Sequence, residues 1–158
     1  MLQQDKTLRV MHLIRDPRGV LTSRWKAQFN FANIPVSDTL RYVKITCARM
    51  SDDVKTCRLL EMKYPKRIIG IRYEDLVSDH AHVAREVYDT LLGVPVPKEV
   101  FDGLDASINA DKSHSAYGTM RRNSTETAFH WKTIMDPWLQ EQVTNLCRSF
   151  LIDMRYEI

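Results

Sequence analysis

Short apolar runs alternate with longer segments of helical periodicity along this chain, a pattern typical of α/β proteins. Residues 8–14 (LRVMHLI) and 67–72 (RIIGIR) are the apolar runs, and each predicts a short strand. The first strand is expected to be buried on both faces. The helical patterns cover residues 17–28, 37 or 38 to 63, 78–92, 97–105 and 136–151. This order predicts an α/β fold with few parallel strands flanked by helices and right-handed crossovers.

Local signals define the ends of these helices. Asp16 and Pro17 favour a helix start, because aspartate is a good N-cap and proline suits the first helical position. The same two residue types recur at Asp136 and Pro137, where the last helix is predicted to begin. Gly93 and the prolines that follow it end the third predicted helix.

Three parts of the pattern are less regular. The pair Asp52–Asp53 indicates a break in the long second helix. Residues 106–127 are polar and rich in hydroxyls, which predicts a long loop of the kind that is usually functional or mobile. Two strands alone make a poor sheet, so either further strands are hidden in the sequence or the chain is part of a larger domain.

Length and composition limit the classes of protein that fit. The chain has 158 residues, of which 44% are hydrophobic, as expected for one globular domain. The net charge of +3 suits an anionic ligand but is far below that of a dedicated nucleic-acid binder, so no nucleic-acid partner is expected. The sequence contains no run of about 18 apolar residues, so it predicts no membrane span.

The residues that follow the first predicted strand present many hydrogen-bond donors. Arg15 is predicted at the carboxyl end of the strand, where ligands gather in open α/β sheets and where the next helix points its amino end. Gly19 and Ser23 share a helical face, on which glycine leaves room and serine offers a hydroxyl. With the planar donors of Arg15 they form a candidate phosphate clamp. The alternative is that Arg15 and Arg18 are solvated and that Asp16 is only a cap.

The stretch RDPRGVLTSR (15–24) resembles the 3′-phosphate-binding segment of sulfotransferases that use the donor PAPS (3′-phosphoadenosine 5′-phosphosulfate). In that family an arginine ends a strand and a serine follows eight residues later. Those positions are Arg15 and Ser23 here. The resemblance therefore implies that these two residues bind the 3′-phosphate of PAPS.

Two further segments carry the same resemblance. YPKRIIGIRYEDLV (64–77) resembles the second strand of the family and its RYEDL turn, so Tyr73 is expected to contact the adenine. The residues alone favour a half-buried core tyrosine at that position, and they favour a helix start rather than chemistry at Glu74 and Asp75. AREVYDTLLGVPVP (84–97) resembles a helix of the family with its proline-rich exit.

The fourth segment, RRNSTETAFHWK (121–132), resembles a late basic loop of the family. By that analogy Arg121, Arg122 and Ser124 close over the nucleotide. The alternative is a solvated loop in which Ser124 or Thr125 caps the next helix.

Together the four segments most resemble the Golgi carbohydrate sulfotransferases, especially those that act on the 6-hydroxyl of N-acetylglucosamine, galactose or N-acetylgalactosamine. The resemblance implies transfer of a sulfuryl group from PAPS to a hydroxyl of a glycan or glycosaminoglycan acceptor. It also implies a place in the Golgi lumen or at the Golgi membrane, and no metal cofactor. A non-catalytic alternative is a module that binds the nucleotide, or binds sulfated glycans through Arg15, Arg18, Arg121 and Arg122.

The implied fold is a partial P-loop-type sulfotransferase fold. The family cradles the 5′-phosphosulfate in a Gly-rich loop that bears a lysine, and none of the five glycines here lies in such a pattern. The catalytic base of the family also lies upstream, so no catalytic residue is assigned. Residues 1–158 are expected to be the C-terminal portion of one sulfotransferase domain, inactive alone, with a membrane anchor only in a full-length form.

Cysteines and histidines add weaker signals. A continuous helix would separate Cys47 and Cys57 by about 15 Å, so only a break near Ser51–Asp53 would let them form a disulfide. His80 and His82 are spaced for a metal only on a strand and have no evident third ligand, which argues against a metal site.

Overall fold

The structure is a computed structural model that describes residues 1–28, 35–108 and 124–158. Strands β1 (Val10–Ile14) and β2 (Ile68–Arg72) form a two-stranded parallel sheet. Val10 pairs with Ile68 and the register continues to the strand ends. The described part of the connection between the strands contains helices, as is usual for parallel pairing. This confirms the predicted α/β class and the presence of both strands. The predicted burial of β1 on both faces is wrong, because Met11 and Leu13 are exposed on one face.

Helices make up most of the remaining described fold. Between the strands lie α1 (Pro17–Gln28) and α2 (Val36–Lys63). After β2 come α3 (Tyr73–Ser78), α4 (His80–Leu91), α5 (Lys98–Ile108), α6 (Ser124–Phe129), α7 (Trp131–Ile134), α8 (Pro137–Leu146) and α9 (Arg148–Asp153). None of the helices in the described ranges is long and apolar enough to cross a membrane.

Both predicted caps are present. The Asp16 carboxylate accepts a hydrogen bond of 2.8 Å from the backbone N–H of Arg18, and Pro17 is the first residue of α1. The Asp136 carboxylate accepts one of 3.0 Å from the N–H of Leu139 at the start of α8. In each case the side chain satisfies an amide that the first helical turn leaves without a partner.

Several helix boundaries differ from the prediction. Helix α2 runs through Asp52 and Asp53 without a break, because both side chains lie exposed on its surface and leave its backbone undisturbed. The predicted helix over 78–92 is α4, which begins at His80 because Asp79 caps it by accepting a 3.0 Å hydrogen bond from the N–H of His82. The short helix α3 before it fits the helix start favoured at Glu74 and Asp75. The last predicted helix is divided at Cys147 into α8 and α9.

Both ends of the predicted loop over 106–127 are helical instead. Helix α5 continues to Ile108, and α6 begins at Ser124. Residues 109–123 lie outside the described part of the chain.

The larger apolar core lies between α1, α2 and the C-terminal helices. Its buried residues include Leu21, Val43, Phe150 and Leu151. A disulfide crosses this core from Cys47 in α2 to Cys147, with 5.3 Å between the Cα atoms. The bridge considered between Cys47 and Cys57 is therefore wrong, because the unbroken helix keeps those two residues apart.

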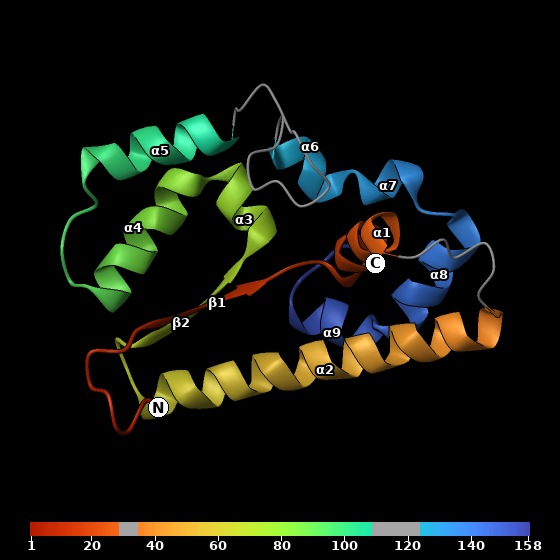
Figure 1. Ribbon diagram of the computed structural model, residues 1–158, viewed down its shortest axis with the longest axis horizontal. Coiled ribbons are helices and arrows are strands. Elements are labelled where there is room, and N and C mark those ends of the chain that lie inside the picture. The colour runs from red at the N-terminus through yellow and green to blue at the C-terminus, as the bar shows by residue number, and fades with distance from the viewer. Residues whose placement is uncertain (29–34, 109–123) are drawn as a thin grey trace.

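A smaller core lies on one face of the sheet. Ile69 and Ile71 of β2 pack against Val83 and Leu91 of α4. Helix α2 contacts β2 as well, and Figure 1 shows the sheet between α2 and α4. The carboxyl ends of both strands lead directly into α1 and α3, which bring the predicted binding residues to one end of the sheet.

Candidate nucleotide-binding site

Arg15 follows β1 and is held between two other segments. One terminal nitrogen, Nη2, donates a 3.0 Å hydrogen bond to the backbone oxygen of Thr127 in α6. The guanidinium carbon lies 4.9 Å from the ring centroid of Tyr73, within the range of a cation–π contact. The Nε atom is buried and has no hydrogen-bond partner among the described residues. Arg15 therefore keeps unused donor capacity at the end of the strand.

Gly19 provides the space that Arg15 occupies. A Cβ atom at position 19 would lie 3.1 Å from Nε of Arg15 and 3.2 Å from Cδ1 of Trp131, closer than most real contacts. Ser23 lies one helical turn after Gly19, on the same face of α1, and is half-buried. The guanidinium thus lies over the helix face that also carries the Ser23 hydroxyl.

Tyr73 is the first residue of α3 and directly follows β2. It is half-buried, and one face of its ring lies near Arg15. The structure therefore brings together two candidates that are 58 positions apart in the sequence.

The late segment is described only in part. Arg121 and Arg122 lie outside the described residues, and the side chain of Ser124 is not described either. Helix α6, which Ser124 begins, reaches the site through Thr127. The hydroxyl of Thr125 donates a 3.0 Å hydrogen bond to the backbone oxygen of Val77, which anchors α6 on α3. Capping of the next helix by Thr125 is therefore wrong.

Arg18 has a structural environment. Its side chain is buried and lies 2.7 Å from the Asp16 carboxylate and 4.2 Å from the ring centroid of Trp131. It also donates a 2.7 Å hydrogen bond to the backbone oxygen of Glu157. The expectation that Arg18 is solvated is wrong, and its burial removes it from the sulfated-glycan surface of the non-catalytic alternative.

Sequence reasoning missed a buried carboxylate beside these residues. Only 3% of Glu74 is exposed. Its two oxygens each accept a 3.0 Å hydrogen bond, one from the backbone N–H of Asp16 and one from the hydroxyl of Tyr156. Burial raises the pKa of the Glu74 carboxyl, although both hydrogen bonds favour its ionised form. Its place in the RYEDL motif was a signal, but nothing local identified Tyr156.

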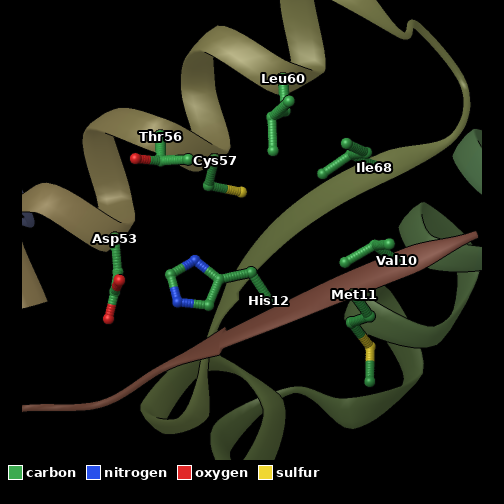
Figure 2. A pocket seen from close by; sticks show the side chains of 8 residues that line it. All are labelled: Val10, Met11, His12, Asp53, Thr56, Cys57, Leu60 and Ile68. Carbon is green, nitrogen blue, oxygen red and sulfur yellow. The ribbon is translucent and has the colours of Figure 1, made fainter. Parts of the chain in front are cut away.

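A hollow of about 310 Å³ lies between β1 and α2, away from Arg15. Figure 2 shows the His12 ring reaching from β1 toward Asp53 and Cys57. Burial, and then the nearby charge of Glu61, raises the pKa of the Cys57 thiol to about 11. This thiol is therefore protonated at neutral pH and is a poor nucleophile.

The described residues contain no cluster of three or more histidine, cysteine, aspartate or glutamate side chains that could hold a metal ion. His80 lies 2.8 Å from the carboxylate of Asp105 instead. Its ring nitrogen is thus engaged in a contact between α4 and α5.

Comparison with known proteins shows which family the chain belongs to. A family model described as the sulfotransferase domain matches residues 2–155. Carbohydrate sulfotransferase 1 of Homo sapiens is 26% identical over 163 residues, which cover 96% of this chain and 39% of that protein. Carbohydrate sulfotransferase 3 of Homo sapiens is 29% identical over 154 residues, which cover 89% of this chain and 32% of that protein.

Carbohydrate sulfotransferase 1 of Danio rerio is 26% identical over 163 residues, covering 95% of this chain and 38% of that protein. The chain thus spans about two fifths of the length of these relatives or less. No solved structure matches it significantly. The resemblance drawn from the four segments is confirmed: the chain belongs to the sulfotransferase domain family, within which it is related to the carbohydrate sulfotransferases.

Proposed function

We propose that this chain is the part of a carbohydrate sulfotransferase that binds the 3′-phosphate and adenine of PAPS. The observation that best supports this proposal is the hydrogen bonding of the Arg15 side chain. Its guanidinium is fixed by Thr127 and Tyr73, yet its buried Nε has no partner among the described residues. Arginine carries five N–H donors, and the half-buried guanidinium can offer those not bonded to Thr127 to a phosphate oxygen.

Each candidate residue has a proposed role in nucleotide binding. Arg15 donates to the 3′-phosphate, and Ser23 adds a hydroxyl from the same side of α1. Tyr73 contributes the apolar face for the adenine. Arg121, Arg122 and Ser124, which come from the segment before and at the start of α6, cover the nucleotide.

The reaction proposed for the complete enzyme moves a sulfuryl group between two oxygens. The bond from sulfur to the 5′-phosphate oxygen of PAPS breaks, and a bond from sulfur to a sugar hydroxyl oxygen forms. A base takes the hydroxyl proton, and positive charge stabilises the leaving phosphate oxygen. The acceptor is a 6-hydroxyl of N-acetylglucosamine, galactose or N-acetylgalactosamine in a glycan or glycosaminoglycan.

The Gly-rich 5′-phosphosulfate loop and the base are proposed to come from a part of the domain outside residues 1–158. The sheet supports this, because β1 is poorly covered. Met11 is 51% exposed and Leu13 is 49% exposed, although both lie in a strand with an apolar sequence. An additional element on β1 would cover them.

A Golgi lumenal location is part of the same proposal. The disulfide between Cys47 and Cys147 supports it, because disulfides form and persist in oxidising compartments such as the secretory pathway.

Calorimetry with two nucleotides tests the binding role. The ligands are adenosine 3′,5′-bisphosphate (PAP) and adenosine 5′-phosphate (AMP), which lacks the 3′-phosphate. Arg15→Ala should weaken PAP binding by about 1.5–3 kcal/mol and leave AMP binding nearly unchanged, because it removes a charge-assisted hydrogen bond. Arg49→Ala is the control, since it removes an equal charge from an exposed position on α2.

Equal losses for PAP and AMP in Arg15→Ala would place this side chain away from the 3′-phosphate.

A sulfate-transfer assay on glycans that end in N-acetylglucosamine tests whether the catalytic base lies outside residues 1–158. Little or no transfer by residues 1–158 is expected, and robust turnover would overturn the proposal that the base lies elsewhere.

A further inference from the structure

Glu74 is the buried group that the proposed binding roles leave unexplained. The residue is 3% exposed, and burial raises the pKa of its carboxyl. An apolar side chain would fill the same space without the desolvation that a carboxylate requires. The function of Glu74 therefore depends on the hydrogen bonds that its two carboxylate oxygens accept.

One oxygen holds the turn that carries Arg15. Oε1 accepts a 3.0 Å hydrogen bond from the backbone N–H of Asp16, in the peptide unit that joins Arg15 to Asp16. Fixing that peptide plane sets the backbone direction at Arg15, and with it the direction in which the side chain leaves the strand. The contact spans 58 positions in the sequence, so no local structure supplies it.

The same residue is fixed to the second binding turn. Glu74 directly follows Tyr73, whose ring lies 4.9 Å from the guanidinium carbon of Arg15. One carboxylate thus ties the end of β1 to the end of β2 at the point where both present nucleotide-binding candidates. A displaced turn would move Arg15 and Tyr73 relative to each other.

The other oxygen is held by the C-terminal segment. The hydroxyl of Tyr156 donates to Oε2 over 3.0 Å, and burial followed by the charge of Glu74 raises the pKa of Tyr156, so the hydroxyl keeps its proton. The guanidinium carbon of Arg72 lies 4.4 Å from the centroid of the Tyr156 ring. Arg18 also bonds the backbone of Glu157, so the segment is attached at two places.

We infer that Glu74 is a positioning residue for the 3′-phosphate clamp, and that Tyr156 of the C-terminal segment holds Glu74 in place. The inference rests on the proposed function. Glu74 does not touch the nucleotide in this arrangement; it acts through the Asp16 amide and the adjacent Tyr73. Its effect should fall on the contribution of the 3′-phosphate to binding.

The test compares Glu74→Met with Glu74→Gln. Methionine has similar length but accepts no hydrogen bond from Asp16, whereas glutamine keeps an acceptor for Asp16 and can donate to the Tyr156 oxygen. The measured quantity is the ratio of AMP to PAP dissociation constants by calorimetry. Glu74→Met should lower this ratio about tenfold, the equivalent of one lost hydrogen bond to a charged group. Glu74→Gln should keep the ratio close to that of the wild-type chain.

A purely structural role would lower stability without changing the ratio, so an unchanged ratio in folded Glu74→Met overturns the inference. Near-ultraviolet circular dichroism establishes folding. If Glu74→Met does not fold, Tyr156→Phe decides instead, with a smaller decrease in the ratio expected and an unchanged ratio against the inference. A wild-type chain that does not distinguish PAP from AMP would contradict the proposed function itself, which separates the two failures.

Discussion

Met11 and Ile69 are paired in register and face the same side of the sheet, yet Met11 is 51% exposed and Ile69 is 6% exposed. Leu13 and Ile71, the next pair on that face, differ in the same way at 49% and 5%. The difference arises because α4 packs on β2 and leaves β1 uncovered. Two strands of similar apolar sequence are therefore in different environments.

The outer edges of the two strands differ as well. The N–H of Gly70 points away from β1 and donates a 2.7 Å hydrogen bond to the Glu61 carboxylate of α2. Alternation along a parallel strand directs the backbone groups of Met11 and Leu13 to the other edge, where no described side chain bonds them. A side chain thus occupies the edge of β2, while the edge of β1 is available to a further strand.

The largest effect is expected from the disulfide that anchors α2, the helix packed on β2. Cys47→Ala combined with Cys147→Ala should lower the free energy of unfolding by about 4–5 kcal/mol, since the cross-link closes a loop of 100 residues. Urea unfolding followed by tryptophan fluorescence measures the change. This loss would show that the cross-link stabilises the helix that packs on β2.

Cys57→Ala is the control, because it removes a buried thiol but no cross-link. Thiol counting in denaturant should find one reactive cysteine without reductant and three with it. A urea midpoint that is insensitive to reductant would show that the disulfide does not stabilise the fold.

The amino-acid pattern predicts the elements of this fold well and their surroundings poorly. Helices α1 and α8 begin where capping and proline signals place them, because those signals act within one turn. The disulfide partner of Cys47 lies 100 positions away, and spacing carries no information about such a contact. Burial of β1 on both faces was predicted from its apolar composition, but composition does not reveal which element covers a strand.

The candidate site shows the same limit. The resemblance identified Arg15, Ser23 and Tyr73 from motifs that are continuous in the sequence. The roles of Arg18 and Glu74 depend on contacts with Trp131, Glu157 and Tyr156, which only the fold brings near. Long-range polar contacts therefore had to be found in the structure.

A matched pair of truncations on the common face tests the comparison directly. Ile71→Ala should lower the free energy of unfolding by about 2–4 kcal/mol, because it leaves a cavity beside α4. Leu13→Ala should lower it by less than about 1 kcal/mol, because half of that side chain is already in water. Urea denaturation of both variants under the same conditions gives the two values.

Equal losses from the two truncations would mean that β1 is covered to the same extent as β2. The comparison would then fail, and with it the support that exposed Leu13 gives to an additional element on β1. A difference of about 1 kcal/mol or more in the expected direction would sharpen it.

The smallest effect is expected at Met11. Met11→Lys should change the free energy of unfolding by less than about 0.5 kcal/mol, because the side chain is half-exposed and can extend its ammonium into water. The same variant should reduce concentration-dependent association in sedimentation experiments, since a charge on an open strand opposes pairing with other chains. Met62→Lys, at a 73% exposed position on α2, is the control and should leave both measurements unchanged. A destabilisation by Met11→Lys as large as that of Ile71→Ala would show that β1 is buried after all.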